Sequence, residues 1–314
     1  MDGIMKNNND FNNYPIPEKL NIVIFFATIA ITWYFLWLAS HGVWWSIILA
    51  AFGFSFFHNT LFSLLHEAVH GVFSTNPKIN ALFGHLSAAT FPTAFTMQGI
   101  AHLGHHKRNR TDVEIFDYYL PHESKLRRNF ILYFGNLFGL YWFTIPFINL
   151  LILIAPTFST SNWFIEKVGK PLGFEPFLKE IAEIPKLRLW SESFLAFSYQ
   201  VFIWYILDLN WQGWLIAHWA FALHWSSLQY VDHAWSPRDI INGAWNLKVH
   251  PLSRLIALNY HCHLAHHRFP QVPWIYLPKL VDKEEESPTF WKIYFSLWKK
   301  GVQPAPPMTK EKVI

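Results

Sequence analysis

Residues 102–106 read His102-Leu103-Gly104-His105-His106, and residues 263–267 repeat the pattern as His263-Leu264-Ala265-His266-His267. A third cluster, His66-Glu67-Ala68-Val69-His70, precedes both. Residues three or four apart lie on one face of a helix, so each cluster predicts a helix that aims its imidazoles at one point. Neutral imidazole binds iron, copper, zinc and nickel, so the clusters predict a metal site without identifying the metal.

The composition places these histidines in a membrane protein. Hydrophobic residues make up 52% of the chain and charged residues only 15%, which is unusual for a soluble domain of 314 residues. Aromatic residues reach 19%, and Trp-rich stretches lie near the ends of the apolar runs, as in interfacial belts. Because a polar ring in a bilayer is costly unless it binds something, the histidine clusters are expected to be functional. We predict an all-α, multi-pass integral membrane protein.

The charge distribution indicates sidedness and excludes nucleic acid as a partner. The net charge is +4, and basic residues stand beside the second histidine cluster. Positive flanks mark the cytoplasmic side of a membrane protein. These basic runs are short and interrupted by acidic residues, unlike a nucleic-acid-binding patch. The residues are Lys107, Arg108, Arg110, Arg127 and Arg128, and we hypothesise that they also dock an acidic electron donor.

A single cysteine limits the redox chemistry that the chain can carry out alone. Cys262 excludes a disulfide framework and a fused iron–sulfur or rubredoxin-type domain, which needs four ligands. We find no P-loop and no Gly-x-Gly-x-x-Gly after a strand, so no nucleotide or flavin site is visible. Any electrons are therefore expected to come from a separate protein.

Three regions are predicted along the chain. Residues 1–19 form a flexible polar tail without the build of a signal peptide. Residues 20–280 form the membrane domain. Residues 281–314 form an amphipathic helix, with aromatic and lysine residues at helical spacing, and a disordered tail after Gln303.

The first two apolar runs predict a membrane hairpin. Leu20–Ala39 and Val43–Leu65 are each about 20 residues long, which suffices to cross a bilayer. The hairpin returns His66 to the side from which the chain started. Residues 70–102 are predicted to be interfacial or re-entrant, because a full crossing would place the first and second clusters on opposite sides of the membrane.

An even number of crossings must also separate the second and third clusters. Residues 130–156 predict one span, and residues 194–225 exceed the bilayer's requirement by about ten residues. The longer run is either one pass or two short helices with a break near Asp208-Leu209-Asn210. We expect about four transmembrane helices, and up to six, with a cytosolic helical cap that carries the metal site.

The clusters permit more than one chemistry. His66-Glu67-x-x-His70 matches the helix of zinc metalloproteases with Glu67 as general base, but a protease leaves the other two clusters unexplained. A histidine-rich metal transporter is a second alternative. His233 adds a ninth imidazole, with Gln229 one turn earlier. Nine nitrogens suit two ions better than one, and the lack of thiolates favours two irons over copper(I) or an iron–sulfur cluster.

The three clusters in this order, separated by apolar hairpins, resemble the membrane fatty acid desaturase and hydroxylase superfamily over roughly residues 20–280. The resemblance implies four transmembrane helices under a cytosolic cap and a non-haem di-iron centre on the cytoplasmic face. The element around His233 is similar to the family's Asn-x-x-x-His ligand, with Gln229 in place of the Asn. The implied metal ligands are His66, His70, His102, His105, His106, His233, His263, His266 and His267.

The resemblance also implies a reaction. The expected enzyme is an O₂-dependent di-iron oxidoreductase that introduces a double bond into a long acyl chain of a lipid. A hydroxylase or ketolase of a lipid, alkane or carotenoid is the alternative on the same scaffold. The expected cofactors are two iron ions (Fe²⁺/Fe³⁺) with O₂ as co-substrate, and the electron donor is a ferredoxin, rubredoxin or cytochrome b5 type protein. Residues expected to orient the ligands are Glu67, Asp112, Glu114, Asp117, Gln229 and Asp232.

Overall fold

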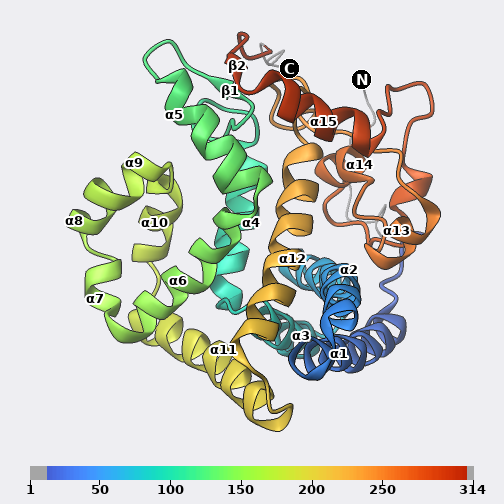
Figure 1. Cartoon of the computed structure of the whole chain (residues 1–314). Coiled ribbons are helices and arrows are strands. Elements are labelled where there is room, and N and C mark those ends of the chain that lie inside the picture. Colours follow the sequence, from blue (N-terminus) through green and yellow to red (C-terminus); the bar gives the residue numbers. More distant parts are fainter. Residues whose placement is uncertain (1–12, 310–314) are drawn as a thin grey trace.

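Two helical hairpins form the centre of the computed structural model, which describes residues 13–309. The first hairpin joins α1 (Glu18–His41) to α2 (Trp44–Val69), and the second joins α11 (Lys186–Ile206) to α12 (Trp211–Val231). The turn of the first hairpin contacts the turn of the second, where the Asn210 backbone N–H donates to Ser40 Oγ over 3.2 Å. The histidine clusters lie at the opposite end of these helices (Figure 1).

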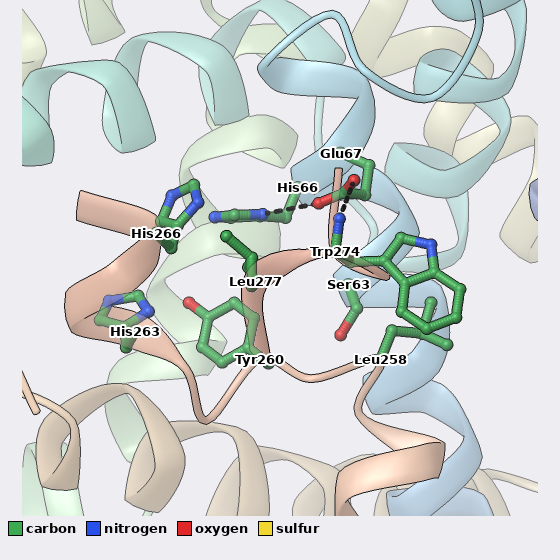
Figure 2. A pocket seen from close by; sticks show the side chains of 9 residues that line it. All are labelled: Ser63, His66, Glu67, Leu258, Tyr260, His263, His266, Trp274 and Leu277. Atoms are coloured by element: carbon green, nitrogen blue, oxygen red, sulfur yellow. Dashed lines mark hydrogen bonds and ion pairs between the residues drawn. The ribbon is translucent and has the colours of Figure 1, made fainter. Parts of the chain in front are cut away.

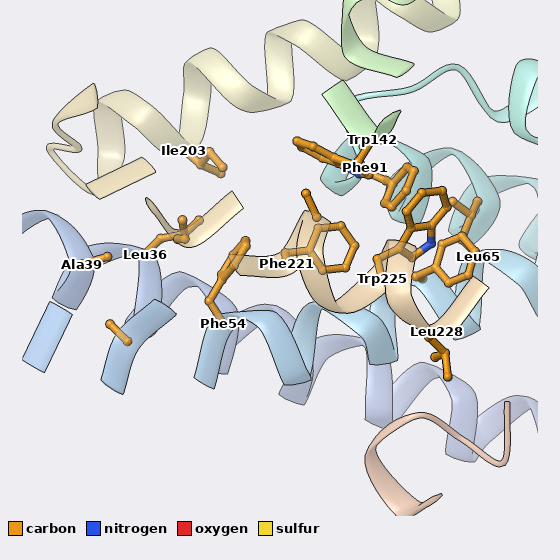
Figure 3. Packing of buried hydrophobic residues seen from close by; sticks show 14 of the residues in the cluster. Leu36, Ala39, Phe54, Leu65, Phe91, Trp142, Ile203, Phe221, Trp225 and Leu228 are labelled. Carbon is orange, nitrogen blue, oxygen red and sulfur yellow. The ribbon is translucent and has the colours of Figure 1, made fainter. Parts of the chain in front are cut away.

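Large aromatic side chains fill the space between the hairpins. Phe54 of α2, Phe221 of α12 and Trp142 are fully buried and pack in one hydrophobic cluster with Leu36 of α1 and Ile203 of α11 (Figure 3). The ring centroids of Trp142 and Phe221 are 5.7 Å apart with the planes nearly perpendicular, a favourable edge-to-face arrangement. This packing fixes the four helices relative to one another and thereby the ends that carry the histidines.

The predicted first hairpin is confirmed. Both α1 and α2 are long and apolar enough to cross a membrane. The span predicted over residues 130–156 is bent, since helices 125–137 and 140–154 meet at an angle of 79°, and the two together form either one broken span or a re-entrant loop. The bend is at Gly139, whose φ of +81° favours glycine and where an added Cβ would lie 2.7 Å from the backbone of Ala222. Close approach to α12 therefore forces the bend.

The long apolar run over residues 194–225 is divided into two helices. The chain breaks at Asp208, which has a φ of +47°. Asn210 then caps α12 by accepting a hydrogen bond from the Gly213 N–H over 2.7 Å. Of the two arrangements that the sequence left open, the one with a break near Asp208-Leu209-Asn210 is observed. Each helix has 21 residues, or about 31 Å, which is long enough to cross the hydrocarbon layer. Among the described residues, however, only α1, α2 and the bent pair 125–137 and 140–154 are both long and apolar enough to do so. The number of membrane passes stays a prediction.

Two short helices connect the first histidine cluster to the second. α3 (Pro77–Thr90) and α4 (Phe95–Arg108) have 14 residues each, too few to cross a bilayer. Asn76 starts α3 by accepting from the Lys78 N–H, and Pro77 occupies its first turn. Neither helix crosses a bilayer by itself, and that the path from residue 70 to residue 102 stays on one side of the membrane remains a prediction.

The remaining elements form an outer layer and a cap. The outer layer, at the left of Figure 1, follows α4, and the cap follows α12. The outer elements are β1 (Tyr118–Tyr119), α5 (Lys125–Phe130), the π-helix η2 (Ile131–Leu137), α6 (Leu140–Ile154), α7 (Pro156–Ser159), α8 (Asn162–Phe164), the π-helix η3 (Ile165–Gly169), α9 (Lys170–Leu172) and α10 (Glu175–Ala182). The cap elements are α13 (Pro251–Ile256), α14 (His263–Arg268), the 3₁₀ helix η4 (Leu277–Lys279), α15 (Phe290–Lys300) and β2 (Gln303–Pro304).

The C-terminal region differs from its prediction. α15 buries Ile293 and Leu297 while Trp291 and Phe295 stay exposed, so the helix is amphipathic. The segment after Gln303, expected to be disordered, is instead ordered as far as Thr309 because β2 pairs in parallel with β1. Most of the tail predicted over residues 1–19 lies outside the described residues, and α1 already begins at Glu18.

Candidate metal centre

The nine histidines singled out in the sequence converge from four elements. α2 carries His66, His70 directly follows its last residue, and α4 carries the second cluster. His233 lies two residues after the end of α12, and the six-residue α14 carries the third cluster. The ligand atoms form two groups, within each of which all atoms lie within 4.8 Å of one another. The five-histidine group is His66, His70, His102, His106 and His266; the four-histidine group is His105, His233, His263 and His267.

Ring nitrogens face one another at short distances in the five-histidine group. The Nε2 atoms of His70 and His102 are 2.8 Å apart, and those of His102 and His106 are 3.1 Å apart. His106 Nε2 is also 3.0 Å from His266 Nε2. The five imidazoles therefore point at a common centre.

The four-histidine group has the same character. His233 Nε2 lies 3.1 Å from His105 Nε2 and 3.0 Å from His263 Nε2. The His267 ring is 4.8 Å from that of His263 between centroids, and its Nε2 is buried without a hydrogen-bond partner among the described residues. The second centre is thus built by α4, α14 and the loop that follows α12.

These distances fit a pair of metal ions. Two ligand nitrogens at right angles on one ion, each about 2.1 Å from it, are about 3.0 Å apart. The buried Nε2 atom of His66 also has no partner among the described residues. A buried polar atom without a partner is costly, and a metal ion would satisfy it. The donor set is entirely neutral nitrogen, which suits a transition metal.

Burial keeps the rings in the neutral form that binds metal. It lowers the pKa of His70 to about 4 and that of His106 to about 2. Burial also lowers the pKa of His233, His263 and His266 well below the usual value. The imidazoles are therefore unprotonated at neutral pH, and no proton has to leave before an ion binds.

Three histidines meet a partner on the side away from the metal centre. His105 Nδ1 lies 2.9 Å from Glu114 Oε1, and His233 Nδ1 donates to the Gly243 carbonyl over 2.7 Å. Glu67 Oε1 is 3.8 Å from His66 Nδ1, while its Oε2 accepts from the Trp274 N–H (Figure 2). Such contacts fix the tautomer and the direction of a ligand ring.

Two of the acidic residues expected to orient the ligands do not reach a histidine. Asp112 is largely exposed and pairs with Arg238 over 2.5 Å. Asp117 is fully buried and forms a two-pronged pair with Arg110, over 2.7 and 3.0 Å. The expectation that Asp112 and Asp117 contact a ligand histidine directly is therefore wrong. The loop after α4 turns both side chains toward arginines and leaves Glu114 facing His105.

Gln229 and Asp232 lie beside the centre without contacting a histidine through a hydrogen bond. Gln229 Oε1 accepts from the Tyr260 hydroxyl over 2.9 Å, and the Tyr260 ring packs against His66 and His263, with centroids 5.3 and 5.0 Å away. Tyr260 was missed in the sequence, although its place three residues before His263 could have indicated it. Asp232 is buried, neither oxygen has a partner among the described residues, and burial raises its pKa.

Most of the basic side chains near the second cluster are used inside the fold. Arg110 is 1% exposed, and Arg108 pairs with Glu180 over 2.7 Å. Arg128 donates to the carbonyls of Ile115 and Tyr118. Lys107 and Arg127 stay exposed. The hypothesis that all five residues dock an electron donor is therefore wrong for Arg110, which no partner could contact.

Other histidines lie outside both groups. His261, the nearest rival for a ligand position, contacts Cys262 Sγ through Nε2 over 3.5 Å. His58 packs against Phe54 and Phe221 within α2 and α12, and His250 caps α13. The structure thus separates the nine clustered histidines from the isolated ones by position alone.

A large cavity reaches the metal centre from the side of the outer layer. Its volume is about 340 Å³, and it lies between α4, α6, α10 and α12. Its lining includes His102, His105 and His233 together with the apolar side chains of Ile145, Ile148 and Phe177. A second cavity, of about 10 Å³, is lined by His66, His263 and His266 with Tyr260 and Leu277 (Figure 2). Only the larger cavity has room for more than one small molecule.

Comparison with known proteins gives two findings. The family model described as fatty acid desaturase matches residues 42–298, which covers most of the chain and all nine histidines. A chloroplastic omega-3 fatty acid desaturase from Ricinus communis is similar, with 25% identity over 303 residues. The aligned region covers 90% of this chain and 61% of that relative, so the chain spans less than two thirds of the relative's length.

Proposed function

Because the chain belongs to the fatty acid desaturase family, we propose that it is an O₂-dependent, non-haem di-iron desaturase acting on a long acyl chain of a lipid. Family membership makes it an oxidoreductase of lipid metabolism. One observation supports the di-iron desaturase proposal above all others. A mostly apolar cavity is lined by histidines of both the five-histidine and the four-histidine group.

The proposed desaturation consumes no side chain of the protein. A saturated –CH₂–CH₂– unit, O₂, two electrons and two protons give –CH=CH– and two water molecules. Two iron ions, held by the five- and four-histidine groups, would supply the reduced centre at which O₂ is activated. The chain itself positions the substrate and orients the imidazoles, and burial keeps rings such as His70 and His106 neutral.

The large cavity supports an extended, apolar substrate. Met97, Ile145, Ile148 and Phe177 offer hydrocarbon surface, and burial of each CH₂ group contributes about 0.8 kcal/mol to binding. His102 of one group and His105 of the other both line this cavity. A chain that fills the cavity would therefore bring a C–C bond near both metal positions, as the removal of two hydrogens requires.

The fold supports a site on the cytoplasmic face. The turns of both hairpins meet at one end, and all nine histidines lie at the other. Lys107, Arg127 and Lys125 are exposed near the histidine end, as expected for cytoplasmic flanks. In this proposal α1, α2, α11 and α12 are the four spans. The electrons would come from a separate ferredoxin, rubredoxin or cytochrome b5 type protein.

The alternatives from other classes have less support. A zinc metalloprotease needs one ion and an accessible general base, but Glu67 is 3% exposed and is held by the Trp274 N–H. A metal transporter needs ligands along a path through the bilayer, whereas the nine histidines lie at one end of the helices. A hydroxylase or ketolase of a lipid, alkane or carotenoid uses the same centre, and the product distinguishes it.

The test is to express the protein with and without His266→Ala and to compare lipid extracts by mass spectrometry. A desaturase gives a lipid that has lost two hydrogens, and a hydroxylase gives one that has gained an oxygen. Elemental analysis of the purified protein should find about two irons per chain. One zinc per chain, or a product that persists in His266→Ala, would overturn the proposal.

A further inference from the structure

Two loops adjoin the four-histidine group, and they are fastened to each other. The first follows α4, which carries His105, and begins four residues after that histidine; the second follows α12 and contains His233. Asn109 Nδ2 donates to the carbonyls of Ile240 and Gly243 over 3.0 and 3.2 Å. The Gly243 carbonyl is also the one that accepts from His233 Nδ1. The direction of the His233 ring thus depends on how these loops are joined.

A buried ion pair forms the centre of the junction. The Arg110 guanidinium holds both oxygens of Asp117 and also donates to the Ser236 carbonyl over 3.1 Å. Asp117 Oδ2 accepts from the Trp235 N–H over 2.7 Å, two residues after His233. Arg110 has a φ of +60°, a strained conformation for a residue with a side chain, so its neighbours must hold it in place.

The C-terminal segment closes over this junction. The Gln303 N–H donates to the Asp117 carbonyl over 2.9 Å, and the Ala305 N–H donates to the Tyr119 carbonyl over 3.0 Å. Arg238, which is 4% exposed, donates to the Pro306 and Arg110 carbonyls, and its own carbonyl accepts from the Thr309 N–H. Figure 1 shows β1, β2 and α15 side by side at the top of the molecule.

We propose that the segment 302–309, together with Arg238, positions the four-histidine group and is not needed for the five-histidine group. The hydrogen bonds of this segment lead to the two loops, to α5, to the end of α15 and to Arg238, while Val302 packs against Leu132 and Leu137 of η2. The five-histidine group receives His66 and His70 from α2 instead, which the segment does not touch. The segment and Arg238 act through the loops and not on an ion, so they are positioning residues. This inference rests on the proposed di-iron function.

Full-length point variants test it. Gln303→Pro removes the N–H that holds Asp117, and Gln303→Ala keeps it as the matched control. Arg238→Met removes the donated hydrogen bonds while keeping the length of the side chain. Asp112→Asn is its control, because Asp112 is exposed on the outer side of Arg238. Each purified protein is supplied with iron(II), and its metal content is measured together with its electron paramagnetic resonance spectrum after oxidation.

The expected result for Gln303→Pro and Arg238→Met is a fall from about two irons per chain toward one, because loss of such support weakens metal affinity about 10- to 100-fold. The spectrum should change from that of a spin-coupled pair to that of a single ferric iron, and both controls should stay at two. Two irons in both variants, or loss of both irons together, would overturn the inference. If the unmodified protein bound no iron, the proposed function itself would fail.

Discussion

The two histidine groups share two helices but are held in different ways. α4 and α14 contribute to both groups; the five-histidine group adds His66 and His70 of α2, and the four-histidine group adds His233 from a loop. α2 is an interior helix: 61% of its most apolar 18-residue stretch is buried, compared with 28% for the corresponding stretch of α1. In the described part of the chain, outer-nitrogen hydrogen bonds to a carboxylate or carbonyl occur only in the four-histidine group, at His105 and His233. The interior helix α2 orients its ligand rings by packing, whereas the four-histidine group also uses hydrogen bonds, at His105 of α4 and at His233 of the loop.

The largest predicted effects are losses of product and of metal on substitution of two adjacent histidines. His266 and His267 follow each other in α14 but belong to different groups. His266→Ala and His267→Ala should each lower product at least about 100-fold, because each centre would lose a ligand that no neighbour replaces. Metal analysis should find about one ion per chain in each variant, with different spectra. Identical spectra would show that the division into two groups is incorrect.

The next effect concerns the support of His105. Glu114→Leu removes the carboxylate that lies 2.9 Å from His105 Nδ1 and should weaken metal binding about 10- to 100-fold. Glu114→Gln keeps an acceptor at this position and should recover most of the affinity. Competition with a chelator measures both. Equal affinities for Glu114→Leu and the unmodified protein would mean that His105 is held by α4 alone.

Glycine substitutions compare the loop with the helix. In Gly243→Ala the added Cβ would lie 2.2 Å from the Asp239 carbonyl oxygen and 2.4 Å from Arg110 Cγ. We expect a loss of stability of about 1–3 kcal/mol and a displaced His233. In Gly99→Ala, on the helix that carries His102, the Cβ meets nothing within 4 Å, and we expect unchanged or slightly higher stability, by up to about 1 kcal/mol. Thermal unfolding in detergent gives both values, and equal melting temperatures would contradict the comparison.

The smallest predicted effect is the pH dependence of the metal-free protein. Burial lowers the pKa of His70 from 6.5 to about 4, so the unfolded chain binds more protons than the folded one between these values. Stability is therefore complete above pH 6.5 and falls as the pH drops through this window, by at most about 1.4 kcal/mol per pH unit for this ring. Melting temperatures of chelated protein from pH 7.5 to 5 should decrease. A flat profile would show that the ring is not buried without metal.

Local patterns made the nine histidines and the first hairpin predictable. Spacing of three or four residues and runs of about twenty apolar residues are properties of consecutive positions, and helices translate them directly into faces and spans. The same reasoning did not predict the bend within residues 130–156, because the bend at Gly139 depends on the approach of α12 from another part of the chain. It also failed to separate Glu114 from Asp112 and Asp117, since all three stand in one charged loop.

The sequence by itself determined that this is an all-α membrane protein with nine imidazoles in clusters, because hydropathy and helical spacing are encoded by neighbouring residues. Only the tertiary structure decided how the nine divide into five and four, and that Glu114, Tyr260 and the Gly243 carbonyl stand beside them. The physical reason is distance along the chain: His105 meets His233 across 128 positions, and no local pattern specifies such a contact.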